Sequence, residues 1–245
     1  MMTRAILPLL LLASPALAGT FTPPADCTAH LTIQSRGCVV SHFYTCEADP
    51  KGNQWRADFG YDGQFYESMI DSETQWIESY DFDPSGSGAK IKETLDPNPR
   101  DPASFSELVA TGLDSFDFNL TKETGERTRV TGFDKLTGKT AVIDGVTLKQ
   151  TEFEYTQTDL DGNVLRHAKG HEYISEDYRT FLAGQSEWES EDGSWIMMNG
   201  APITFILPGE PGFGATKPLF ECDAQMSQFS PDLKPLIEEP AHDNL

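Results

Sequence analysis

The 245-residue sequence is poor in basic residues, and this excludes two classes of direct partner. It has 18 lysines and arginines against 39 aspartates and glutamates, which gives a formal net charge of −21 at pH 7. Nucleic acids and anionic lipid surfaces are bound chiefly by clustered lysine and arginine side chains. We therefore expect no nucleic acid as a partner. An acidic surface keeps a chain soluble, or it docks a basic partner.

Signatures of catalysis and of metal or phosphate binding are also missing. The sequence contains no G-x-S-x-G nucleophile elbow. The glycine-rich segment 207–216, LPGEPGFGAT, lacks the Lys-Ser/Thr ending of a phosphate loop. His167 and His171 would lie ~13 Å apart on an extended strand, too far for one metal ion. The sequence thus predicts a protein that is not an enzyme, with no metal and no cofactor.

Long apolar runs are scarce, and the one at the N-terminus has the features of a secretory signal peptide. Arg4 precedes the apolar run 5–12, and Ala16-Leu17-Ala18 fits an A-x-A cleavage site. The run is shorter than the ~20 residues of a membrane span. Thr20 stands where a lipobox would have its lipidated cysteine. We expect cleavage after residues 1–18 and a soluble, periplasmic or secreted protein without a membrane anchor.

Cysteines are few, and four of them in an exported chain favour two disulfides. If Arg36-Gly37 forms a two-residue hairpin loop, Cys27 falls opposite Cys46, within disulfide distance. Cys38 and Cys46 would lie ~26 Å apart on one strand, so they cannot bridge. We predict the pairs Cys27–Cys46 and Cys38–Cys222. No C-x-x-C spacing indicates zinc.

Hairpin signals dominate the rest of the chain. Asp-Gly pairs occur four times, at 62–63, 144–145, 161–162 and 192–193, and favour type I′ turns. They predict a mainly β fold, with a single antiparallel meander of roughly ten strands. After a long loop at 81–102, one short helix is predicted, with Asp101 as its N-cap, Pro102 at its first position and its end before Gly112. We expect one domain over 19–222 and a loose acidic C-terminal tail over 223–245.

Large aromatic and apolar side chains gather on the predicted strands. The first Asp-Gly hairpin would place Phe59 opposite Tyr66 and Trp55 opposite Ile70, which gives it one apolar face. The third would set Tyr155 against Ala168, and the fourth would put Trp188 across from Met197. These side chains either fill the core beneath the sheet or line a concavity that receives an apolar ligand. The candidate ligand-binding residues are Trp55, Phe59, Tyr66, Ile70, Trp76, Tyr155, Trp188 and Met197.

Two stretches resemble the LolA/LolB-like superfamily of periplasmic lipoprotein carriers, over about residues 50–200. One is GNQWRADFGYDGQFYESMIDSETQWIESYDFD, with a tryptophan-bearing strand, an Asp-Gly hairpin and a W-x-x-Y-D strand. The other, TGKTAVIDGVTLKQTEFEYTQTDLDGNVLRHAKGHEYISEDYRTFLAGQSEW, ends near a YIS-x-(D/E)-x-R strand. The resemblance implies a half-open antiparallel barrel with a helical lid. Arg56 is nearest to the ligand-gripping arginine of those carriers and would face away from Trp55.

These expectations lead to two functional hypotheses. The first is a soluble exported binding or carrier module for an apolar ligand, such as a lipid, an acyl chain or a lipidated protein. The alternative is a non-enzymatic envelope interaction protein, with a filled core and an acidic surface that docks a partner. A concave face that takes up apolar ligand would distinguish the first from the second.

Overall fold

The computed structural model describes residues 19–83 and 90–225, and within them thirteen strands form one antiparallel sheet. The sheet order is β12-β11-β10-β9-β8-β7-β6-β5-β4-β3-β2-β1-β13, so it is a meander apart from β13. The predicted mainly β class with a single antiparallel sheet is confirmed. The strands are β1 (Cys27–Ser35), β2 (Val39–Cys46), β3 (Gln54–Gly60), β4 (Gly63–Ile70), β5 (Trp76–Phe82), β6 (Lys90–Leu95), β7 (Leu113–Lys122), β8 (Arg127–Ile143), β9 (Val146–Thr158), β10 (Val164–Ser175), β11 (Thr180–Glu189), β12 (Trp195–Asn199) and β13 (Pro202–Ile206).

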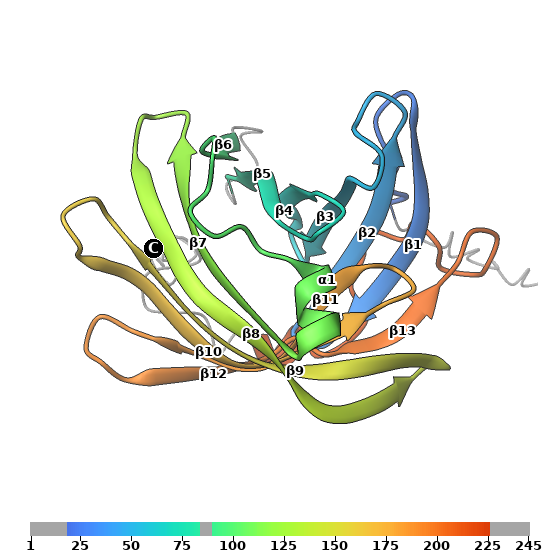
Figure 1. Ribbon diagram of the computed structural model, residues 1–245. Coiled ribbons are helices and arrows are strands. Elements are labelled where there is room, and N and C mark those ends of the chain that lie inside the picture. Colours follow the sequence, from blue (N-terminus) through green and yellow to red (C-terminus); the bar gives the residue numbers. More distant parts are fainter. Residues whose placement is uncertain (1–18, 84–89, 226–245) are drawn as a thin grey trace, which may run out of the picture.

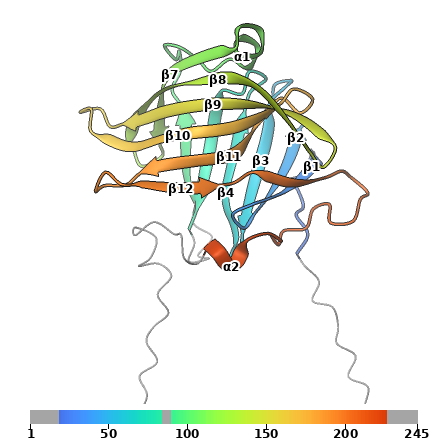
Figure 2. The same cartoon turned by 90° about the horizontal axis from the view of Figure 1, so that it is seen from below.

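The sheet is strongly curved and incompletely closed. Figure 1 shows β7–β12 on one side and β1–β4 on the other, and in Figure 2 β8–β12 run across β1–β4. A short link connects β12 at one edge to β13 at the other. In this link Gly200 N donates to Gly184 O at 2.9 Å, and Arg36 N donates to Ala201 O at 2.9 Å. The two edges therefore meet at this link without pairing, which gives the expected half-open barrel.

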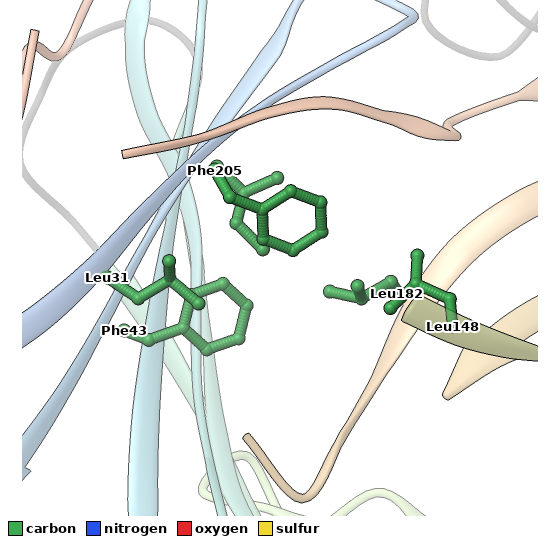
Figure 3. Close-up of a cluster of buried hydrophobic side chains, with 6 residues drawn as sticks. Leu31, Phe43, Leu148, Leu182 and Phe205 are labelled. Carbon is green, nitrogen blue, oxygen red and sulfur yellow. The ribbon is translucent and has the colours of Figure 1, made fainter. Parts of the chain in front are cut away.

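An apolar cluster fastens the two sides of the curved sheet to each other. Strands β1, β2 and β13 contribute one part of it, and β9 and β11 contribute the other. Figure 3 shows these side chains pointing toward one another. Because each of them is less than 8% exposed, the cluster removes most of their apolar surface from water. The buried members are Leu31, Ile33, Phe43, Leu148, Leu182 and Phe205.

The predicted short helix is α1 (Phe105–Thr111), and it lies beside β7 and β8 at one end of the curved sheet (Figure 2). Its N-cap is Ser104, whose hydroxyl accepts from Glu107 N, whereas the sequence predicted Asp101. Gly112 ends the helix in the left-handed region, with φ of 87°. Phe105 and Leu108 pack on Ile174 of β10. A single turn, α2 (Cys222–Gln225), follows the last strand.

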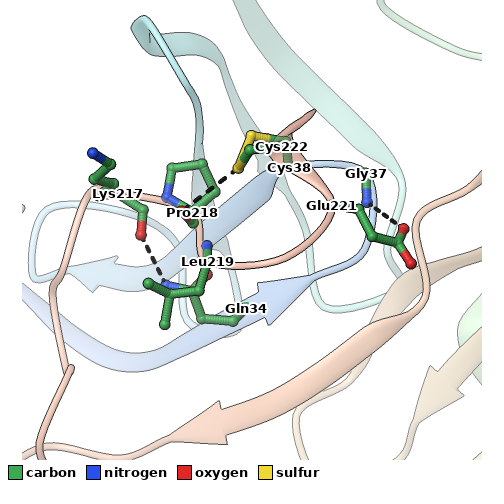
Figure 4. The surroundings of a disulfide bond; sticks show 8 residues. All are labelled: Gln34, Gly37, Cys38, Lys217, Pro218, Leu219, Glu221 and Cys222. Carbon is green, nitrogen blue, oxygen red and sulfur yellow. Dashed lines mark hydrogen bonds between the residues drawn. A yellow bond between two sulfur atoms is a disulfide. The ribbon is translucent and has the colours of Figure 1, made fainter. Parts of the chain in front are cut away.

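Both predicted disulfides are confirmed. The hairpin disulfide, Cys27–Cys46, joins paired positions of β1 and β2 with a Cα–Cα distance of 3.9 Å. The long-range disulfide, Cys38–Cys222, joins the β1–β2 loop to α2 across 184 residues. Figure 4 shows its surroundings, where Gln34 Nε2 donates to the carbonyl of Lys217 at 3.2 Å. Two cross-links of this kind indicate an oxidising compartment.

Part of the predicted organisation lies outside the described residues. That part contains the predicted signal peptide, residues 1–18, and residues 226–245 of the predicted tail. The predicted long loop over 81–102 is wrong in extent, because β5 continues to Phe82 and β6 begins at Lys90. Among residues 19–83 and 90–225, no helix combines the length and apolarity that a bilayer crossing requires.

Candidate functional site: the concave face of the sheet

The hairpin β3–β4 pairs one residue away from the predicted register. Asp58 lies opposite Tyr66, where the sequence predicted Phe59. The connecting loop is 61–62 instead of the Asp-Gly pair, and a bulge follows it. Side chains alternate between the two faces of a sheet, so this shift puts Tyr66 and Phe59 on opposite faces. The predicted apolar face of this hairpin, which contained both, is wrong.

Interactions across the sheet identify which face is concave. The side chains of Tyr66 on β4 and Tyr155 on β9 interact electrostatically, although five strand positions separate them in the sheet. Arg56 on β3 and Glu172 on β10 interact in the same way. Strands so far apart in the order can approach only across the inside of the curve. The face that bears these four side chains is therefore the concave face.

The predicted ligand-binding residues divide between the two faces. Register and ring contacts bring Trp76 against Phe118 at 5.9 Å and Tyr155 against Trp188 at 6.4 Å, measured between ring centroids. The concave face carries Tyr66, Ile70, Trp76, Tyr155 and Trp188. The outer face carries Trp55, Phe59 and Met197.

The positions of these three residues contradict the predicted shared face. Trp55 stacks between aromatic rings of β2 and β5 and donates from Nε1 to Asp49 Oδ2 at 2.8 Å. Phe59 packs edge-on against Phe21, at 5.8 Å between ring centroids. Met197 is 72% exposed and lies opposite Glu187. The sequence predicted it opposite Trp188, an error of one residue that changes its face.

The apolar half of the concave face lies over β5–β9. Phe118, Leu120 and Val130 are buried there, and Phe116 and Tyr155 pack against them. The two tryptophans of the concave face flank this cluster, one on β5 and one on β11. Trp76 remains 43% exposed even though it contacts Phe118. Aromatic surface is thus presented to the inside of the barrel.

Gly132 on β8 is the position that lets these rings lie flat on the sheet. A Cβ atom there would come within 2.8 Å of Phe116 Cζ and 2.7 Å of Tyr155 Cβ. Both distances are far below van der Waals contact. Any larger residue would push the two rings away from β8, so glycine preserves the smooth apolar surface.

The charged half of the concave face is centred on Arg56 and Asp58. Arg56 Nε lies 3.0 Å from Asp58 Oδ2, and Ser41 Oγ donates to Asp58 Oδ1 at 2.6 Å. Asp58 is buried, whereas 36% of the Arg56 side chain is reached by water. The arginine faces away from Trp55, as the sequence predicted. Its Nε atom is itself buried, so Arg56 is a partly accessible cation inside the curve.

Two carboxyl groups, Asp58 and Glu172, interact with this arginine, and further acids on the same face are buried, which makes their ionisation difficult. Burial raises the pKa of Glu172 to about 7, although the positive charge of Arg56 opposes the shift. Burial and the nearby Glu172 raise the pKa of Asp134 well above its ordinary value. The pKa of Asp114 is raised to about 6, again mainly by burial. One arginine does not compensate this many buried acids, so protons take the place of counter-charges.

Sequence reasoning missed these acids because it treated the many carboxylates of this chain as a solvated surface. Alternation along β10 contained the signal, since Glu172 shares its face with Ala168 and Ile174, both buried. Thr151 lies opposite Glu172 and is fully buried, and its hydroxyl has no hydrogen-bond partner within the described part of the chain. A buried polar atom of this kind is available to a water molecule or a ligand.

Comparisons add no relative. No protein-family model, no curated protein and no solved structure matches the chain. The chemistry of the concave face therefore rests on its own residues. It combines exposed aromatic rings with a polar centre of one arginine and several protonated or partly protonated carboxyls. Such a surface can hold an amphiphilic molecule, with its apolar part on the rings and its polar end near Arg56.

Proposed function

We propose that the protein is a soluble exported binding or carrier protein, acting in the periplasm, that holds an apolar chain on the concave face. The ligand would be a lipid, an acyl chain or the acyl group of a lipidated protein. The observation that supports this most is the aromatic surface left open inside the curve, with Trp76 43% exposed between the two sides of the sheet. Helix α1 covers a different part, near Ile174.

The polar centre supports a ligand with a polar end. Arg56 is partly accessible and is fixed by Asp58, so it provides an oriented donor beside the apolar half. Glu172 adds a hydrogen-bonding group next to it, and so does the hydroxyl of Thr151, which has no partner among the described residues. In ligand sites, a few placed polar groups of this kind set orientation, while the apolar wall supplies most of the affinity.

A second function is favoured by the position of the hollows. Two hollows of about 560 and 290 Å³ lie away from the apolar half of the concave face. With a net charge of −21, an envelope interaction protein with a filled core and an acidic docking surface accounts for that arrangement. The two functions predict different responses to the same pair of variants.

The decisive experiment compares Trp188→Ala with Trp195→Ala. The two tryptophans lie on neighbouring strands, both are half-buried, and they point to opposite faces of the sheet. Each variant is titrated with a fluorescent fatty acid. If the concave face holds the ligand, Trp188→Ala weakens binding several-fold and Trp195→Ala leaves it unchanged.

Stability measurements on the same variants distinguish the carrier from the interaction protein with a filled core. A filled core predicts that the wild type binds no probe and that Trp188→Ala lowers the free energy of unfolding by about 3 to 5 kcal/mol. That pair of results would end the carrier proposal in favour of the interaction protein. A native mass spectrum of protein purified from its own envelope adds an independent readout, because bound lipid increases the mass.

A further inference from the structure

The outer face of β2–β6 carries a second group of aromatic and charged side chains, separate from the concave site. Three rings lie side by side there, with Trp55 stacked 6.0 Å from Tyr44 and 6.3 Å from Tyr80 between ring centroids. They line a hollow of about 290 Å³, which we call the outer hollow, and the hairpin disulfide lines it as well. Because it lies on the face opposite Arg56, the outer hollow shares no residue with the concave site.

Carboxylates hold these rings in place and make the outer hollow acidic. The hydroxyl of Tyr44 donates to Glu67 Oε1 at 2.7 Å, and that of Tyr80 donates to Glu78 Oε1 at 3.1 Å. Trp55 is held by Asp49. The lining thus contains these three carboxylates and a single amine, Lys90. An anion would be repelled here, whereas a cation gains both from the carboxylates and from the negative faces of the rings.

The chain itself places a cation on this surface. Lys90, the first residue of β6, holds its Nζ 4.1 Å from the centroid of the Tyr80 ring. The Nζ of Lys92 also lies over this ring, 5.5 Å from its centroid, but it is paired with Glu78 Oε2 at 2.5 Å. Lys90 has an exposed side chain. It is therefore the cation that an external one can displace at low cost.

We propose that the outer hollow binds a quaternary ammonium ion and that Lys90 is its internal competitor. Aromatic rings beside carboxylates recognise such ions through cation–π and charge interactions, and the contact point is the place over the Tyr80 ring that Lys90 now occupies. The lining carboxylates disfavour a neighbouring phosphate, so the expected ligand is the bare cation rather than a zwitterionic headgroup. This site does not depend on the carrier function.

The test titrates choline against the full chain by calorimetry at fixed ionic strength. Its uncharged isostere 3,3-dimethyl-1-butanol serves as the ligand control, and phosphocholine tests the zwitterionic headgroup. Choline is expected to bind, while the alcohol does not and phosphocholine binds more weakly. Lys90→Ala should tighten choline binding by about three-fold or more, since it removes the competitor.

Matched variants separate the site from general changes of charge and folding. Lys169→Ala removes an ammonium that lies 3.9 Å from the Trp195 ring centroid, elsewhere on the sheet, and should leave choline binding unchanged. Tyr80→Leu should lose it, whereas Tyr80→Phe, which keeps the ring, should retain it. Equal binding of choline and the alcohol, or a Lys90→Ala variant that binds choline no tighter than wild type, overturns the proposal.

Discussion

Replacing Glu172 with glutamine should make the folded protein less sensitive to pH, and the structure sets the size of the effect. Glu172 lies on the concave face, where burial raises its pKa from 4.5 to about 7. In the unfolded chain the same group titrates near 4.5. Between these two values the folded state holds a proton that the unfolded chain has released. The protonated form therefore stabilises the fold below pH 4.5, and that contribution is lost as the pH rises to 7.

The magnitude follows from the difference between the two pKa values. A shift of one pKa unit corresponds to ~1.4 kcal/mol, so full burial would make the total loss ~3.4 kcal/mol. Water reaches part of the Glu172 side chain, which reduces the figure, and we expect about 2 kcal/mol. Glutamine resembles the protonated acid and does not titrate. The variant and the wild type should thus unfold alike at pH 4.5, and the variant should be more stable by about 2 kcal/mol at pH 8.

Urea unfolding midpoints at pH 4.5, 6, 7 and 8 measure this difference directly. Glu191→Gln, an exposed acid in the β11–β12 turn, is the matched control and should follow the wild type throughout. Arg56→Met in the wild-type background should steepen the pH dependence, because the arginine opposes the raised pKa. Parallel curves for Glu172→Gln and wild type, or a variant that is less stable at pH 8, would refute the reasoning. Either result would mean that the attraction between ionised Glu172 and Arg56 outweighs the cost of burying the charge of Glu172.

Three further predictions concern stability and titration elsewhere in the molecule. Removing the long-range disulfide by Cys38→Ala with Cys222→Ala should cost about 5 kcal/mol in urea unfolding, against about 3 for the hairpin disulfide, because the loops span 184 and 19 residues; equal losses would contradict the chain-entropy argument. Phe59→Ala should lower the free energy of unfolding by about 2 kcal/mol and leave fatty-acid binding unchanged, since Phe59 packs on the outer face. Weakened binding of the fatty acid would contradict the assignment of Phe59 to the outer face. Glu189→Gln should lower the pKa of His167 in an NMR titration, since this carboxylate lies 2.7 Å from Nδ1, and an unchanged pKa would mean that the contact does not form in solution.

The sequence predicted the antiparallel sheet and both disulfides correctly, but the hairpin loop assumed for the Cys27–Cys46 pairing was wrong. The β1–β2 loop has three residues, because Ser35 pairs with Val39, and the assumed two-residue loop is wrong. A bulge at His30 then shifts the register back by one, so Cys27 still lies opposite Cys46. The third Asp-Gly hairpin behaves similarly: its loop is 159–163, yet Tyr155 pairs with Ala168 as predicted. Hydrophobic and charge complementarity over a long pair of strands fixes register more firmly than the turn does.

The same reasoning fails where a hairpin is short or twisted. On β3–β4 the loop moves and a bulge follows, leaving a net error of one residue that exchanges the faces of Trp55 and Tyr66. On β11–β12, Trp188 pairs with Ile196 instead of Met197. Bulges leave no clear mark in the residues themselves, and side chains alternate with a period of two. Fold class can therefore be predicted correctly while half of a candidate site is assigned to the wrong face.

The corrected register changes what each face of the β3–β4 hairpin offers. Arg56 and Tyr66 face inward, where burial raises the pKa of Glu172 to about 7, while Trp55 faces outward beside three carboxylates and Lys90. An inward surface on which a buried acid is partly protonated imposes a smaller desolvation cost on an apolar ligand than one on which that acid is ionised. Raising the pH through 7 ionises Glu172 and should weaken that binding. Glu172 does not line the outer hollow, which lies on the opposite face, so its ionisation should leave choline binding unaffected. The pH dependence of the two ligands thus provides one more way to tell the faces apart.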